Sequence, residues 1–394
     1  HVGKISGRTP AAADDDRKNR RFASETKREK AMNILIDIGH PAHVHLYRNF
    51  YHEMKLRGHN LHVTVKSLPS ATRLLDLYGI PYIKIGTKGD SLAAKAFRQI
   101  DFSMRIAGIA RRLHIDVGLG SSISLAHASK LSRMKSVIFD DDDDLIQPLM
   151  TRFGHPFADL IVSPSSLEHA RASRKALFYP GYHELAYLHP SRFTPDPEVL
   201  KDAGVSQGER FFIMRFNAFR AHHDKGVTGL TRDQKISLVR LLEPHGRVFI
   251  TTEAETDPEL LPYLLKVSSD RAHSLLSFAT MFIGDSQTMT SEAAVLGVPA
   301  LRCNSLAGSI SYLREEEETY GLTYAYKPTE FDHLREKIVS LLKNHDLHDE
   351  WQRKRNVMLS DKIDVTAFMV WLTETYAKNG ERSDLKEIDF NSFR

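Results

Sequence analysis

Short apolar runs alternate with amphipathic segments along most of the chain. In the first half, apolar runs of strand type lie at residues 33–38, 61–66, 82–85, 117–119, 136–139 and 159–163. Segments with helical spacing lie between them, at residues 46–57, 71–78, 92–113 and 124–131. Because strands of a parallel sheet are buried on both faces and each crossover needs a helix, this alternation predicts a doubly wound α/β domain.

The alternation stops and then starts again. Residues 178–197 hold Gly181, four prolines and several aromatics without a clear period, which is typical of a connector between domains. The second series has predicted strands at 211–215, 247–252, 281–283 and 300–303, and predicted helices at 231–242, 258–265, 275–278, 291–296, 309–319, 331–344 and 365–377. The chain therefore divides into two α/β halves of similar size.

The charge distribution narrows the functional classes. Residues 1–31 carry nine Lys/Arg and five Asp/Glu with almost no large apolar side chain, so we expect a disordered or artificial extension outside the fold. The formal net charge of +4 resides there, and the remainder holds 45 charged residues of each sign. A neutral folded part disfavours nucleic-acid binding.

No run of about eighteen apolar residues is present, so no membrane span is predicted. The polar N-terminus lacks a signal-peptide core, and we expect a cytoplasmic protein. The single cysteine, Cys303, lies in a strand-like run and is expected to be a buried, inert thiol.

The most informative stretch is 280–303. A short strand at 281–283 is followed by a polar loop at 284–290 and a helix at 291–296, and Gly297 stands where a helix ends with positive φ. A helix N-terminus at the carboxyl edge of a parallel sheet offers N–H groups and a positive dipole to a phosphate. Glu292, in the first turn, could accept hydrogen bonds from a ribose. A capping box would need Ser or Thr at position 289, which is Met.

The pattern Ser291-Glu292, four residues, then Gly297-Val298-Pro299-Ala300 resembles the donor-nucleotide motif of GT-B glycosyltransferases. It most closely resembles that of the enzyme that adds N-acetylglucosamine to the lipid intermediate of peptidoglycan. It is similar also to the non-hydrolysing UDP-N-acetylglucosamine 2-epimerases, which share that fold. As a whole, the chain is identified as a member of domain-of-unknown-function family 354, a group of predicted glycosyltransferases.

The resemblance implies a GT-B fold, with two Rossmann-like doubly wound domains facing a central cleft. The residue matching Glu292 holds the ribose of a UDP-sugar in those proteins. We expect an N-terminal acceptor domain over 32–179, a linker over 180–200 and a C-terminal nucleotide-sugar domain over 201–360. The resemblance also implies that a helix in 361–378 crosses back to the first domain, and residues 379–394 are expected to be frayed.

Three histidines, at positions 40, 43 and 45, follow the first predicted strand. A neutral imidazole can remove a proton from a sugar hydroxyl. The fifteen residues from His43 to Gly58 match the interval after the Gly-Gly-His pattern of the peptidoglycan enzyme, although Pro41-Ala42 replaces the two glycines here. His43 is therefore the first candidate for a base or sugar contact, and His40 the second. A metal site at positions 43 and 45 lacks a carboxylate or cysteine at ligand spacing.

Five aspartates, Asp140 to Asp144, follow an apolar strand and should emerge at the carboxyl edge of the first sheet. One interpretation is a DxD-type site for Mn²⁺ or Mg²⁺. A second is a base or a sugar-binding group on the acceptor side, for which Asp140 is the candidate. A third is a solvated acidic loop that caps the next helix. Five adjacent carboxylates cannot all be buried without partners.

In the second half, candidate ligands for the nucleotide-sugar follow the strand ends. An arginine there could grip a diphosphate, and the hydroxyls and amides before Glu292 could bind phosphate without a metal. The loop His222-His223-Asp224 could close over the ligand. The predicted set is Arg215, Thr251, Glu253, Asp285, Ser286, Gln287, Thr288 and Glu292.

Together these features predict a metal-independent GT-B glycosyltransferase that uses a nucleotide diphosphate-sugar, with UDP as the expected nucleotide. The acceptor is not identified; a lipid-linked or polysaccharide precursor is one expectation. Two alternatives stay open. One is a 2-epimerase with Asp140 and Glu253 as acid/base candidates, and the other is a non-catalytic nucleotide-sugar-binding protein. The basic, apolar helix at 97–113 also leaves open a peripheral contact with the inner face of a membrane.

Overall fold

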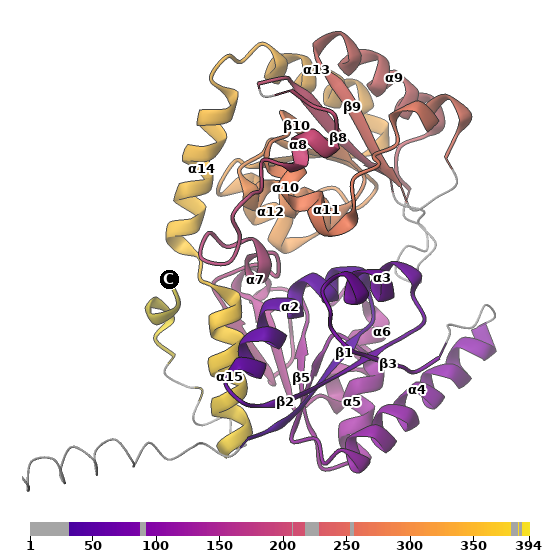
Figure 1. The fold of residues 1–394 in the computed structure, drawn as a ribbon, viewed down its shortest axis with the longest axis vertical. Coiled ribbons are helices and arrows are strands. Elements are labelled where there is room, and N and C mark those ends of the chain that lie inside the picture. Colours follow the sequence, from indigo (N-terminus) through magenta and orange to yellow (C-terminus); the bar gives the residue numbers. More distant parts are fainter. Residues whose placement is uncertain are drawn as a thin grey trace, which may run out of the picture.

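The computed structural model describes residues 31–86, 92–206, 208–216, 228–252, 256–379, 385 and 388–394. Two α/β lobes stack along the long axis of the molecule (Figure 1). All but the last residue of the predicted extension at 1–31 lies outside the described residues. Within the described part, no helix is both long and apolar enough to cross a bilayer.

The first lobe is built on a seven-stranded parallel sheet in the order β3-β2-β1-β4-β5-β6-β7. The strands are β1 (Asn33–Ile38), β2 (Asn60–Val65), β3 (Ile83–Lys84), β4 (Val117–Gly120), β5 (Lys135–Phe139), β6 (Leu160–Pro164) and β7 (Ala176–Tyr179). The order reverses between β1 and β4, and the carboxyl ends of strands at such a reversal are the crevice position at which ligands bind in open α/β sheets. β7 was not predicted from the sequence, and its last two residues overlap the start of the predicted connector at 178–197.

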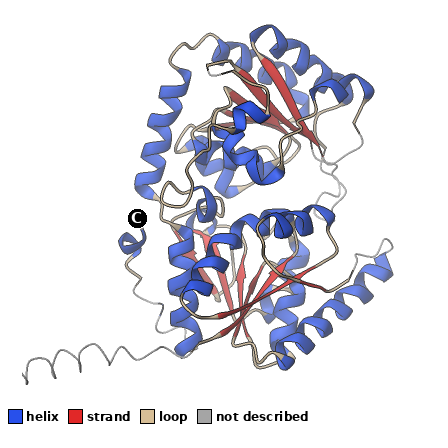
Figure 2. Ribbon diagram, viewed as in Figure 1, coloured by secondary structure: helices blue, strands red, loops and turns tan. Residues whose placement is uncertain are grey.

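Helices cover both faces of this sheet (Figure 2). They are α2 (Pro41–Leu56), α3 (Pro69–Leu77), α4 (Leu92–Arg112), α5 (Ile123–Lys130) and α6 (Pro148–Phe153). The predicted start of the first helix, residue 46, is wrong. Pro41 occupies the first turn, and the His40 side chain accepts a hydrogen bond from the N–H of Ala42 at 3.2 Å. His43 therefore lies on α2 rather than in a loop.

The second lobe holds a five-stranded parallel sheet in the order β12-β11-β10-β8-β9. Its strands are β8 (Phe211–Phe216), β9 (Arg247–Thr252), β10 (Met281–Gly284), β11 (Ala300–Cys303) and β12 (Thr323–Tyr326). Its helices are α8 (Val199–Asp202), α9 (Arg232–Leu242), α10 (Ala272–Ser277), α11 (Gln287–Leu296), α12 (Ser311–Glu318), α13 (Phe331–Leu342) and α14 (Leu347–Asp361). The order reverses between β8 and β10, so the carboxyl ends of these strands are the corresponding crevice position of the second sheet.

Two segments tie the lobes together. The connector forms α7 (Leu185–Leu188), which packs on α2, and the Asn49 amide donates to the Ala186 carbonyl at 2.9 Å. After α14, the helix α15 (Val365–Asn379) returns to the first lobe (Figure 1). There Glu374 pairs with Arg57 and His59, each at 3.3 Å. The connector and α15 therefore hold the two lobes together.

The end of the chain also packs on the fold. Phe393 is 9% exposed, and its ring lies 5.8 Å from that of Phe368 on α15. The N–H of Asp364 donates to the Phe393 carbonyl at 2.7 Å. The expectation of a frayed tail is therefore wrong for residues 388–394, because aromatic side chains there have a buried surface to cover.

Candidate functional site between the lobes

The strand register of the second lobe brings three of the predicted residues, Arg215, Thr251 and Asp285, to one edge of the sheet. Arg215 at the end of β8 pairs with Thr251 on β9 and with Gly284 on β10. The N–H of Asp285 donates to the Arg215 carbonyl at 3.1 Å. A Cβ at position 284 would lie 2.3 Å from that carbonyl oxygen, so only glycine allows this approach. This strand register places Arg215 beside the loop that precedes α11.

The N-terminus of α11 faces the same edge. The helix starts at Gln287, and the Ser286 hydroxyl caps it by accepting from the Met289 N–H at 3.3 Å. The first N–H groups of a helix have no intrahelical acceptor, so those of Gln287 and Thr288 are available to an anion. The expectation that 287–290 form a loop is wrong, because Ser286 supplies a cap that the sequence analysis did not consider.

Glu292 consequently lies in the second turn of α11 rather than the first. Its side chain is buried, at 5% exposure. The carboxylate accepts hydrogen bonds from the Tyr187 hydroxyl at 2.8 Å and from His273 Nε2 at 2.9 Å. The ring of His45, from α2, lies 4.6 Å from that of His273 and 5.5 Å from that of Tyr187. Both donors contact Oε1, so the carboxylate joins the second lobe to the connector, and no described residue donates a hydrogen bond to Oε2.

The aspartate run is not a solvated loop. Asp140 is 5% exposed and hydrogen bonds to His155 Nε2 at 2.7 Å and to Arg171 Nη1 at 2.9 Å. Burial alone would raise the pKa of Asp140, but the hydrogen bond from His155 and the charge of Arg171 lower it. These contacts favour a structural role for Asp140, whose predicted catalytic role stays a prediction.

Asp143 reaches across to the second lobe. It is 7% exposed, and its carboxylate accepts from the N–H of Ser311 at 2.9 Å and from the Ser311 hydroxyl. Ser311 is the first residue of α12, whose N-cap position, Ile310, has no side-chain oxygen. An aspartate of the first lobe therefore caps a helix of the second and fixes how the two edges meet.

The carboxylates of Asp140, Asp141 and Asp142 lie within 4.8 Å of one another. Two of them already have basic partners: Asp140 has Arg171, and Asp141 has His183 at 3.0 Å. Burial, followed by the charges of Asp141 and Asp140, raises the pKa of Asp142 well above its ordinary value. The pairing of two of the three carboxylates favours a site without a metal, and the absence of a metal stays a prediction.

The contacts of His43, the predicted base, determine its tautomer and lower its pKa. Its Nδ1 lies 3.3 Å from the N–H of Gly39, which donates to it. A neutral imidazole whose Nδ1 accepts carries its proton on Nε2, so the free edge of the ring is a donor. Burial and the neighbouring His40 lower the pKa of His43 to about 3. Both properties oppose a role as proton acceptor.

Sequence reasoning missed three residues of this region: His183, Tyr187 and His273. All lie outside recognisable motifs, and only the fold brings them to the interlobe edge. The predicted residues Glu253, His222, His223 and Asp224 lie outside the described residues.

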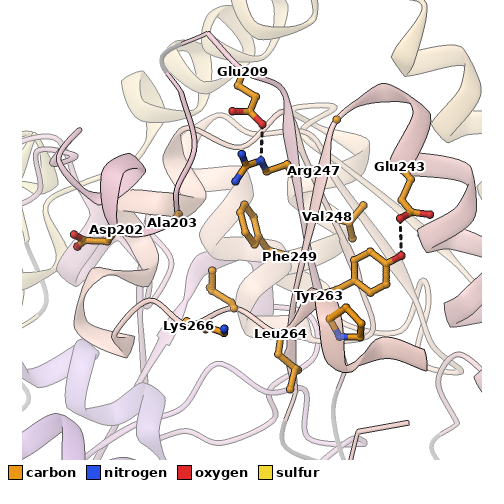
Figure 3. Close-up of a pocket in the computed structure, with 13 residues that line it drawn as sticks. Asp202, Ala203, Glu209, Glu243, Arg247, Val248, Phe249, Tyr263, Leu264 and Lys266 are labelled. Carbon is orange, nitrogen blue, oxygen red and sulfur yellow. Dashed lines mark hydrogen bonds and ion pairs between the residues drawn. The ribbon is translucent and has the colours of Figure 1, made fainter. Parts of the chain in front are cut away.

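A separate cavity of about 610 Å³ lies along β9 (Figure 3). Its walls include the ion pair of Arg247 with Glu209 at 2.6 Å and the Tyr263 hydroxyl, which donates to Glu243 at 2.5 Å. Arg247 begins β9, so this cavity lies at the amino end of the strand, away from the carboxyl edges that face the other lobe. It holds none of the predicted site residues.

Two doubly wound lobes with facing carboxyl edges define a GT-B fold, the class to which the solved relatives belong. The UDP-GlcNAc 2-epimerase from Neisseria meningitidis, solved bound to UDP-GlcNAc, matches with a TM-score of 0.67 and 14% identity over 88% of this chain and 100% of that chain. The glycosyltransferase VinC, in complex with dTDP, matches with a TM-score of 0.54 and 13% identity over 87% and 99%. At these identities the likeness shows the fold alone.

The chain belongs to the family described as protein of unknown function DUF354, whose model matches residues 32–323. It is also 23% identical over 305 residues to the uncharacterized protein MJ0665 of Methanocaldococcus jannaschii, covering 73% of this chain and 86% of that protein. The membership predicted from the sequence and the GT-B fold are both confirmed.

Proposed function

We propose that this protein binds a nucleotide diphosphate-sugar between its lobes and transfers the sugar to a hydroxyl-bearing acceptor. The observation that carries the proposal is the convergence of Arg215 with the N-terminus of α11 at the second crevice. A guanidinium and two helix N–H groups form an anion-binding edge suited to a diphosphate. Structures of the same fold class were solved with UDP-GlcNAc and with dTDP, which supports a nucleotide-linked ligand for this protein.

Glu292 is the proposed ribose ligand. In this structure its carboxylate has two donors, Tyr187 and His273. A buried carboxylate needs donors to stay charged, and ribose hydroxyls are donors of the same kind. We propose that a ribose hydroxyl donates to Oε2 of Glu292 while Tyr187 and His273 keep Oε1, which would couple nucleotide binding to the contact between the second lobe and the connector.

The proposed mechanism is metal-independent. The leaving diphosphate would be stabilised by Arg215 and by the α11 N–H groups rather than by a cation. In the first lobe, Asp140 and Asp141 are balanced by Arg171 and His183. A chelator should therefore leave both binding and turnover unchanged.

The first lobe is the proposed acceptor side, and α4 supports a peripheral contact with an anionic membrane. Phe97, Ile100 and Met104 are 74%, 63% and 53% exposed and lie at i, i+3 and i+7, along one stripe of the helix. The same helix carries Arg105, Arg111 and Arg112. An apolar stripe with basic neighbours is the pattern of a helix that lies in a membrane interface.

An epimerase is the second candidate, because the same fold class includes the UDP-GlcNAc 2-epimerase of Neisseria meningitidis. Incubation with UDP-N-acetylglucosamine alone separates the two. Formation of the 2-epimer without an acceptor, detected by proton NMR, would overturn sugar transfer in favour of epimerisation.

The proposal is tested by thermal shift with UDP-, GDP-, dTDP- and CMP-sugars, each with and without EDTA. A ligand at one hundred times its Kd should stabilise the fold by about 2.7 kcal/mol. We expect stabilisation by a UDP-sugar, unaffected by EDTA and weakened in Glu292→Gln. Absence of stabilisation by every nucleotide-sugar would overturn the proposal. Binding without turnover of any donor would leave a nucleotide-sugar-binding protein.

A further inference from the structure

We propose that His183, oriented by Asp141, is the general base that takes the proton from the acceptor hydroxyl. The inference rests on the proposed sugar transfer and assigns the base to the connector, whereas the sequence pointed to His43. The evidence for it is that Nδ1 of His183 donates a hydrogen bond whereas Nδ1 of His43 accepts one.

The His183 ring has a defined orientation. Its Nδ1 lies 3.0 Å from Oδ2 of Asp141, the second residue after β5. Because the carboxylate accepts the Nδ1 proton, the neutral ring carries its lone pair on Nε2. The side chain is 11% exposed, and Nε2 is buried with no hydrogen-bond partner among the described residues. Buried polar nitrogens are normally paired, so an unpaired acceptor calls for an explanation. A substrate hydroxyl would supply the missing donor.

The pair lies where the lobes meet. Asp141 follows β5 at the carboxyl edge of the first sheet, close to His43 on α2. The charged groups that act on His183 are Asp141, Glu184 and Asp140, and Tyr312 of α12 approaches Glu184 and Asp141 from the second lobe. The base is thus next to the acceptor edge and opposite the lobe proposed to hold the donor.

The two imidazoles have complementary roles. His43 presents an N–H at Nε2, because its Nδ1 accepts from Gly39. His183 presents a lone pair at Nε2, because its Nδ1 donates to Asp141. A sugar or lipid-linked hydroxyl is both donor and acceptor, so His43 can hold its oxygen while His183 receives its proton.

The step balances without a further reagent. The acceptor O–H bond breaks and its proton moves to Nε2 of His183. The acceptor oxygen forms a bond to the anomeric carbon, and the bond from that carbon to the diphosphate oxygen breaks, with the electron pair leaving on the diphosphate. Asp141 stabilises the imidazolium that results.

The pH dependence follows from the same contacts. Burial would lower the pKa of His183, but the charge and hydrogen bond of Asp141 raise it above the ordinary value. The base is active when unprotonated, so the rate should fall as the pH drops through this raised pKa. Removing the charge of Asp141 should move that limb to lower pH.

The test uses the full chain and the variants His183→Gln, Asp141→Asn and His43→Gln. UDP binding is measured by calorimetry, and turnover as UDP release from UDP-N-acetylglucosamine across pH. General bases typically contribute 10²- to 10⁴-fold, so His183→Gln should lower kcat by about a hundredfold or more, with UDP affinity unchanged and the acid limb abolished. Asp141→Asn should shift the limb to lower pH. His43→Gln, which keeps an N–H donor, should lose less than His183→Gln.

The outcomes separate the two proposals. A wild-type chain that binds no UDP would overturn the proposed function and this inference with it. Normal UDP binding and release with His183→Gln within about threefold of wild type would overturn the base assignment alone. The tautomer is read independently of turnover from the ¹⁵N spectrum of labelled histidines. A proton on Nδ1 of His183 supports the assignment, and one on Nε2 overturns it.

Discussion

The two lobes share a parallel architecture but present opposite chemistry at their facing edges. The edge of the first lobe carries the aspartate run and His43, beside His183 of the connector. The edge of the second carries Arg215 and the capped N-terminus of α11, groups that bind anions. The proposed acid/base and phosphate-binding roles therefore depend on the residues that follow the strand ends and not on the parallel topology that the two lobes share.

The largest effect, a loss in the free energy of unfolding, is expected from replacing Asp140, the aspartate that the sequence indicated as a catalytic residue. Asp140→Ala leaves Arg171 buried without its closest carboxylate, and breaking a buried ion pair typically costs about 3–5 kcal/mol. Urea unfolding measures this loss. Asp142→Asn is the matched control: it removes a crowded carboxylate from the same run and should leave stability unchanged or higher. If Asp140→Ala were as stable as wild type, the structural role of Asp140 would be contradicted and its catalytic role would be favoured.

The second effect concerns Glu316 on α12, a fully buried carboxyl at the face of the second lobe. Burial raises its pKa to about 8, although the Ser291 hydroxyl donates to it at 2.5 Å. The folded state therefore holds a proton that the unfolded state releases, and stability should fall as the pH rises from about 4.5 to 8, by a few kcal/mol.

Denaturation midpoints across this pH range test the prediction, with Glu316→Gln as the comparison. The variant keeps a polar group beside Ser291 without a proton to lose, so its midpoint should depend less on pH. A wild-type stability that rises with pH over this window would contradict the assignment.

A smaller effect, on ligand affinity alone, is expected at Arg215. Hydrogen bonds to charged groups contribute about 1.5–3 kcal/mol, so Arg215→Gln should weaken UDP binding by roughly tenfold to a hundredfold. Arg232→Gln, which removes exposed contacts to Asp257 and Glu259, is the matched control and should bind UDP as wild type does. Unchanged affinity in Arg215→Gln would remove the phosphate role of the second lobe.

The smallest effect is expected at the surface of the first lobe. Replacing Phe97 and Ile100 by Ser should weaken cosedimentation with vesicles that contain anionic lipid by roughly threefold to tenfold per residue, since each exposed apolar side chain contributes about 1 kcal/mol on insertion. Leu56→Ser is the control, because Leu56 is 88% exposed on another helix. Equal binding of all variants, or none by the wild type, would contradict the membrane contact.

The sequence predicted most of the helices and strands but few of the side-chain contacts between them. The strands 33–38, 247–252 and 300–303 match the structure at both ends. The helix at 287–296 was predicted four residues too short, because the polar residues Gln287 to Thr290 look like a loop until Ser286 is recognised as a cap. β12 and α14 were missed, since a four-residue strand and a polar helix carry weak periodic signals.

Local periodicity and the Ser291-Glu292 pattern were sufficient for the fold class, the two-lobed organisation and the family, because burial imposes a repeat that is readable along one dimension. Which aspartate faces the cleft, which imidazole keeps a free lone pair, and what Glu292 touches before a ligand arrives were decided by the packing of distant elements. Asp141 meets His183, and Glu292 meets Tyr187, only because the connector folds between the lobes. A hydrogen bond depends on positions in space, and no spacing along the chain encodes it.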